Sequence, residues 1–114
     1  MITLPNIDPS MIANNLTPFE PTHPGELIKD ELEARNMSQA ALARQIGMSP
    51  TQLNEIIHGK RAVNTETAML LEAAWGIDAD LWLNLQADYD KQMARSNPKF
   101  MDRLAAIRKV AAVL

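Results

Sequence analysis

The sequence predicts an all-α fold of five to six helices in one domain. From residue 24 onward, apolar side chains recur mainly at three- and four-residue intervals, the spacing of helices that pack on a core. Capping residues and glycines, including Ser38, Gly47, Ser49 and Gly76, divide this part of the chain into short helical segments. A chain of 114 residues with 46% hydrophobic residues is also long enough to bury a core without disulfides or metals.

Residues 39–61 predict two short helices joined by a tight turn, with a basic loop after the second helix. Ser38 can cap the first helix, and Gly47 supplies the left-handed backbone that ends it. Ser49 and Pro50 can start the second helix, where Gln52 can complete a capping box with Ser49. These helices, the second and third of the domain, therefore form a helix-turn-helix.

The second helix of this motif separates apolar from polar side chains. On a helical wheel, Leu53, Ile56 and Ile57 share one side, whereas the opposite side carries Thr51, Glu55 and His58. Hydroxyl and amide side chains can read base edges in a major groove, and the following Lys60-Arg61 pair can neutralise phosphates. The alternative is a pair of amphipathic helices with a solvated polar face, but caps, glycines and basic loop all fall at helix-turn-helix offsets. We therefore expect this motif to bind DNA.

Charge is unevenly distributed along the chain. The net charge of −3, taken alone, disfavours a nucleic-acid partner, but residues 35–61 carry four bases and one acid. The flanking segments are acidic, with six acids and one base in residues 1–34 and six acids and no base in residues 62–90. We expect one positive DNA-facing side and an acidic side that suits a basic partner. The candidate contact residues on the acidic side are Asp30, Glu31, Glu33, Glu66, Glu72, Asp78 and Asp80, and the apolar arm of residues 1–23 is a second candidate.

Five further segments complete the predicted organisation. Residues 1–23 contain four prolines and scattered apolar residues, and we expect an extended arm that packs on its own domain, on a second subunit or on a partner. The domain proper spans 24–95, with a helix from Pro24 to about Asn36, one from Asn64 to Trp75 and one that starts at Asp78. Residues 96–114 form a C-terminal amphipathic helix whose apolar stripe is Phe100, Leu104, Ile107, Ala111 and Leu114.

For two helices the sequence predicts which side chains are buried. In the helix of residues 65–75, the buried face is predicted to contain Met69, Leu70, Ala73 and Ala74. Trp75 is expected in the core. Trp82, with Leu81 and Leu85, belongs either to the core or to a dimer interface, where aromatic residues are enriched.

Several kinds of site are not expected. The chain has no cysteine, and its two histidines, His23 and His58, lack nearby carboxylate pairs at metal-ligand spacing. No glycine-rich phosphate loop or nucleophile elbow is present, so we expect no enzyme, no catalytic residue, no metal and no cofactor. Without an apolar run of about 18 residues or a signal-like segment, a cytoplasmic protein with no membrane contact is expected.

Four stretches of the sequence together resemble a known family. The helix-turn-helix segment is similar to the Cro and lambda-repressor-like (XRE) family, which implies a lambda-repressor-like DNA-binding domain. HPGELI at residues 23–28, GKRAVNTETAMLLEAAWG at 59–76 and LWLNLQ at 81–86 narrow the resemblance to HigA-type antitoxins over residues 21–90. The resemblance implies a homodimeric repressor that binds the palindromic operator of its own operon. It also implies a partner, a basic, RelE-like, mRNA-cleaving toxin of HigB type.

The resemblance also assigns positions in the DNA interface. Base-reading positions of the family fall on Ser49, Pro50, Thr51 and Glu55, and the family's phosphate-contacting glutamine corresponds to Gln39. Glu55 departs from the amide or basic residue often useful there, because a carboxylate only accepts hydrogen bonds and repels phosphate. With the residues predicted from the helical wheel and the basic loop, the expected DNA-binding set is Gln39, Ser49, Pro50, Thr51, Gln52, Asn54, Glu55, Lys60 and Arg61.

Two other functions remain open from the sequence. One is a stand-alone helix-turn-helix transcriptional regulator without a toxin partner. The other is a protein-interaction module that no longer meets DNA, which the positive charge of residues 35–61 and the Lys60-Arg61 loop disfavour.

Overall fold

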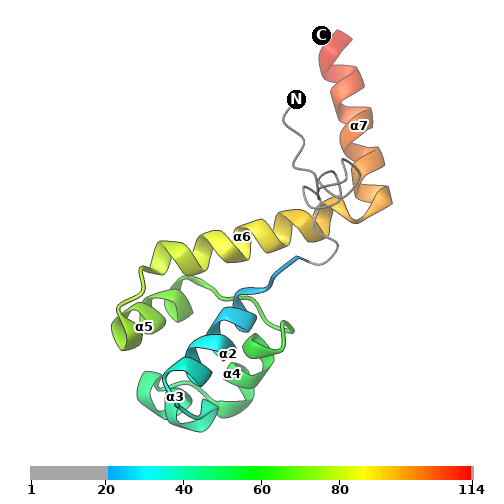
Figure 1. The fold of residues 1–114 in the computed structure, drawn as a ribbon. Helices are drawn as coiled ribbons and strands as arrows, with labels where there is room; N and C mark the ends of the chain where they lie inside the picture. The colour runs from blue at the N-terminus through cyan, green and yellow to red at the C-terminus, as the bar shows by residue number, and fades with distance from the viewer. Residues whose placement is uncertain (1–20, 114) are drawn as a thin grey trace, which may run out of the picture.

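The computed structural model describes residues 21–113, and the predicted arm is therefore outside it except for its last three residues. The described residues form six helices and no strand, which confirms the all-α prediction. In chain order they are α2 (Pro24–Ala34), α3 (Gln39–Ile46), α4 (Pro50–Ile57), α5 (Thr65–Trp75), α6 (Ala79–Arg95) and α7 (Pro98–Val113). Helices α2 to α5 gather at one end of α6, and α7 leaves the other end and points away from them (Figure 1).

The predicted caps account for the short helices. Ser38 Oγ accepts a hydrogen bond from the backbone N–H of Ala41 at 3.0 Å, and Gly47 ends α3 with a φ of 70°. Asn36 ends α2 with a φ of 52°, a left-handed conformation in which asparagine is one of the few tolerated non-glycine residues. Helix bounds were therefore predictable from local chemistry.

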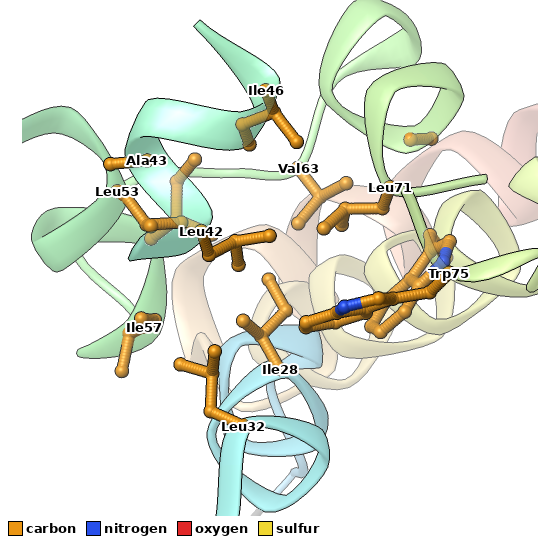
Figure 2. Close-up of a cluster of buried hydrophobic side chains, with 13 residues drawn as sticks. Ile28, Leu32, Leu42, Ala43, Ile46, Leu53, Ile57, Val63, Leu71 and Trp75 are labelled. Atoms are coloured by element: carbon orange, nitrogen blue, oxygen red, sulfur yellow. The ribbon is translucent and has the colours of Figure 1, made fainter. Parts of the chain in front are cut away.

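The core lies where α2 to α5 meet the first turns of α6. Figure 2 shows Ile28 and Leu32 of α2 converging with Leu42 of α3 and Trp75 of α5. Ile28, Leu42, Leu53, Ile56, Leu71 and Trp82 are fully buried. One contiguous cluster thus orients both helices of the motif.

The predicted buried face of α5 is half correct. Leu70 and Ala74 are half-buried and pack against the core, but the other two predicted residues are not buried. Met69 is 58% exposed and Ala73 is exposed, whereas Ala68 and Leu71 are fully buried. Apolar residues occupy most of the circumference of α5, so their spacing did not identify the side that meets the core.

Both tryptophans belong to the core of the single chain. Trp82 is fully buried, and its ring centroid lies 6.2 Å from that of Trp75, which is itself 9% exposed. The alternative that Trp82 forms a dimer interface is therefore wrong, since a side chain with no exposed surface has nothing to offer a second subunit. Leu81 of the same segment remains 44% exposed.

Candidate nucleic-acid interface

Helix α4 presents one apolar and one polar face, as the wheel predicted. Leu53 and Ile56 are fully buried and Ile57 is 8% exposed, so this side fixes the helix in the core. Thr51 and Asn54 are exposed on the other side. The side chains that can meet a ligand are therefore separate from those that hold the fold.

The start of α4 is closed by Ser49. Its Oγ accepts a hydrogen bond from the backbone N–H of Gln52 at 3.3 Å, and Pro50 occupies the first turn. This is one half of the predicted capping box, and no bond from the Gln52 side chain back to Ser49 is found within residues 21–113. The half-buried Gln52 side chain is therefore not committed to the cap.

The end of α4 and the basic loop are also held by backbone bonds. Gly59 has a φ of 75°, its N–H donates to the carbonyl of Ile56, and the N–H of Lys60 donates to the carbonyl of Glu55 at 2.8 Å. Such paired bonds around a left-handed glycine form a Schellman motif. Lys60 and Arg61 leave this turn with exposed side chains.

Glu55 has a partner within the motif. Its Oε2 lies 3.4 Å from Nη2 of Arg61, and both side chains are partly exposed. A surface pair of this length adds little stability, but it directs the guanidinium along the polar side of α4 and offsets part of its charge. This contact, between residues six positions apart, was not foreseen from the sequence.

His58 is an additional candidate for the interface that the predicted set lacks. It is the C-cap of α4, it is exposed, and its Nδ1 lies 2.8 Å from the carbonyl oxygen of Asn54. Because a carbonyl can only accept, Nδ1 carries the proton and the second ring nitrogen is left for another partner. The polar side of the helical wheel already contained His58, which was the available signal.

The predicted residues come together on α4 and its loop, with one exception in another helix. Gln39 is half-buried in the first turn of α3. The other eight follow one another from the cap of α4 to the basic loop: Ser49, Pro50, Thr51, Gln52, Asn54, Glu55, Lys60 and Arg61.

His23 packs against the end of α4 and thereby helps to hold this helix in place. It caps α2 by accepting a hydrogen bond at Nδ1 from the backbone N–H of Gly25 at 2.9 Å, and its ring meets that of Tyr89 edge to face at 4.8 Å. Burial lowers the pKa of His23, while the nearby carboxylates of Asp90 and Glu26 act in the opposite direction. The neutral ring packs beside Gly59, at the end of α4.

Two further supporting residues were not foreseen. A Cβ on Gly25 would collide with the carbonyl oxygen of Ile56 and lie 2.8 Å from that of Ile57, so only glycine allows α2 to approach the end of α4. Buried Gln86 of α6 accepts a hydrogen bond at Oε1 from the N–H of Val63 at 2.8 Å. These contacts fix α4 and its basic loop against two other helices.

Comparisons with known proteins agree with this geometry. The family described as helix-turn-helix matches residues 28–82. Virulence-associated protein I of Dichelobacter nodosus is 40% identical over 76 residues, which cover 66% of this chain and 70% of that protein. No helix within residues 21–113 has both the length and the apolar character needed to span a membrane.

Solved structures of similar proteins have the same fold. An addiction module antidote protein of the HigA family from Coxiella burnetii is 32% identical, with a TM-score of 0.67 over 75% of this chain and 95% of that one. The antitoxin HigA of Pseudomonas aeruginosa, solved with the higBA promoter, is 34% identical, with a TM-score of 0.68 over 74% of this chain and 94% of that one. The chain therefore belongs to the Cro and lambda-repressor-like (XRE) family of helix-turn-helix DNA-binding regulators, in its non-enzymatic HigA-type branch.

Proposed function

We propose that this chain is the antitoxin of a type II toxin-antitoxin module, which represses its own operon and neutralises an mRNA-cleaving toxin of HigB type. The observation that carries the DNA-binding part is the exposed polar side of α4, which leads directly into the exposed Lys60 and Arg61. The HigA protein solved with its promoter DNA has the same fold. In this proposal α4 enters the major groove, and a homodimer places one α4 in each half of a palindrome.

Within this proposal the nine predicted residues divide into four roles. Thr51, Gln52 and Asn54 read base edges, because they are neutral donors and acceptors on α4. Ser49 and Pro50 shape the end of the helix that enters the groove, and Gln39, Lys60 and Arg61 bind phosphate. Glu55 orients Arg61 through their ion pair.

An affinity titration on the palindromic DNA upstream of the gene tests the DNA-binding part. Tight binding that exceeds binding to a scrambled duplex at the same salt concentration supports it. Equal affinity for both duplexes would leave only nonspecific charge attraction and reject operator recognition.

The acidic surface is proposed to bind the basic toxin. Among the predicted contact residues, Glu72 and Asp78 cap α6 through the backbone N–H groups of Ala79 and Asp80, and Glu31 pairs with Arg35. The exposed residues of the set with no side-chain partner within residues 21–113 are Asp30, Glu33, Glu66 and Asp80. These four carboxylates are the best candidates, because binding a basic protein does not remove a contact that the fold already uses.

Co-expression with the product of an adjacent reading frame tests the toxin-binding part. Co-purification and rescue of growth support an antitoxin. Failure of both, with operator binding intact, would favour the second candidate, a stand-alone regulator. That candidate is favoured by the 30% identity over 96 residues to YbaQ of Escherichia coli, described as an uncharacterized HTH-type transcriptional regulator.

A further inference from the structure

Helix α7 carries an apolar surface that no described residue covers. None of its residues is buried, and Phe100, Ile107 and Val110 are 39%, 57% and 61% exposed. Figure 1 shows this helix directed away from the core formed by α2 to α5. A lone 16-residue helix is marginal in water, so this surface needs a covering partner. The surface contains an apolar hollow of about 470 Å³ that is lined by Arg103, Ala106, Ile107, Val110 and Ala111.

The charge of α7 restricts which partner fits. Residues 98–113 contain four bases and one acid, so they repel a second copy of this helix or any other basic protein. The N-terminal arm has the opposite balance, because residues 1–20 contain two acids and no base. The arm therefore complements α7 in charge. It also supplies large apolar side chains that can fill the hollow, among them Ile2, Leu4, Ile7, Met11, Ile12, Leu16 and Phe19.

The described chain begins beside the part of α6 that leads to α7. Pro21 and Tyr89 line one hollow of about 360 Å³, and the ring centroids of His23 and Tyr89 lie 4.8 Å apart. Met93 stands one turn further along the same side of α6 and is 48% exposed. In Figure 1 the chain at residues 21–23 runs from the start of α2 toward the end of α6 that joins α7. The arm is therefore attached to the domain on the way to α7.

The arm is long enough to reach the hollow on α7. Along α6, the turn and α7, the path from Tyr89 to Ile107 is at most roughly 33 Å, with about 1.5 Å for each helical residue. An extended chain covers about 3.3 Å per residue, so roughly ten residues span this path. Counted back from Pro21, this length leads to Met11 and its neighbour Ile12. These two apolar side chains therefore come level with the hollow.

We propose that the arm packs along α7 of its own chain, with Met11 and Ile12 in the hollow. Prolines at positions 5, 9 and 18 favour an extended arm and lack N–H groups that would be left without partners on an apolar surface. The covalent link raises the concentration of the arm at α7, typically to about the millimolar range, so a contact of modest area is sufficient. Added salt should weaken the packing by screening the opposite charges.

Paired cysteines test this placement directly, because the chain has no cysteine of its own. On mild oxidation of the full-length protein, Ile12→Cys combined with Ile107→Cys should form a disulfide within one chain, detected by its mass and by its electrophoretic mobility with and without reductant. The matched control combines Ile12→Cys with Ala105→Cys, an exposed position on the far side of α7. Equal yields from the two pairs, or a main product with the mass of two chains, would overturn the inference.

Hydrogen exchange of the α7 amides gives an independent measurement without DNA, lipid or a second protein. In a variant with Met11→Ser and Ile12→Ser, α7 should exchange at least about tenfold faster than in the parent, while exchange in α2 to α5 stays unchanged. The matched control, Asn14→Ser with Asn15→Ser, should behave like the parent. Equal exchange of α7 in the arm variant and the parent would overturn the inference. Protection of α7 that is lost on dilution would also overturn it, because a contact within one chain does not depend on concentration.

Discussion

Helix α4 allows the folding and DNA-reading roles to be separated by two substitutions only two residues apart. Leu53→Ala removes a fully buried side chain from the centre of the core. Leucine-to-alanine changes at such sites cost about 2 to 5 kcal/mol, and the melting temperature should fall by about 8 °C or more. Thr51→Ala changes an exposed side chain, and its effect on stability should stay within about 0.5 kcal/mol.

The effect on operator binding should be reversed. At a temperature where the Leu53→Ala variant remains folded, it should bind operator like the parent. Thr51→Ala should lose about 1 to 3 kcal/mol of binding, or roughly 5- to 150-fold in affinity, with relaxed preference at one base pair. Gln52→Ala should behave in the same way if its uncommitted amide reads a base.

The assay is a fluorescence titration of each variant on operator and scrambled duplex, beside a thermal melt. If Thr51→Ala and Gln52→Ala both melt normally and bind operator as tightly as the parent, with unchanged base preference, α4 is not the reading helix. A Leu53→Ala variant that melts like the parent would instead contradict the account of the core.

Three further predictions concern the support and the loop of the motif. Gly25→Ala should destabilise the domain by about 1 to 3 kcal/mol, because the added Cβ would overlap backbone carbonyl groups that cannot move aside without shifting a helix. The measurement is the denaturation midpoint, which should be lower than that of the parent. An unchanged midpoint would show that α2 and α4 can move apart freely. Burial lowers the pKa of His23 in the folded state, so at pH values just below the ordinary pKa of 6.5 the unfolded chain binds more protons than the folded one. The melting temperature should therefore fall as the pH is lowered through 6.5. The His23→Asn variant keeps a capping side chain that does not titrate, and its melting temperature should lose this part of the pH dependence. Lys60→Ala and Arg61→Ala should weaken binding to the operator and to the scrambled duplex by the same factor. Each variant should also reduce the slope of log affinity against log salt concentration by about 0.9 for each phosphate contact that is lost. A loss of affinity for the operator alone would place these side chains at base edges.

Local features of this fold were predictable from the sequence because local chemistry determines them. The bounds of α3 and α4 follow from Ser38, Gly47, Ser49 and Pro50, whose effects reach only three or four residues. The buried side of α4 was equally clear, because its apolar residues occupy one side only.

The supporting contacts could not be predicted in the same way, because they depend on how distant helices meet. Nothing in the sequence around Gly25 indicates that the carbonyl of Ile56 will occupy the space of its Cβ. The exposed side of α5 and the burial of Trp82 likewise depend on the direction from which α6 covers the core. The nine predicted DNA-binding residues stay a prediction, since the positions of exposed side chains do not reveal which bases they meet.

The hydrogen bond from Val63 to Gln86 has a consequence for the thermodynamics of DNA binding. Together with the bond from Lys60 to Glu55, it holds both ends of the loop that carries Lys60 and Arg61. Fixing the backbone of one residue costs about 1 to 2 kcal/mol of conformational entropy. In this loop the entropy is lost when the domain folds, so that it is not lost again when the loop binds DNA. The loop should therefore bind phosphate as a rigid preorganised element, with a small entropic penalty and little backbone rearrangement.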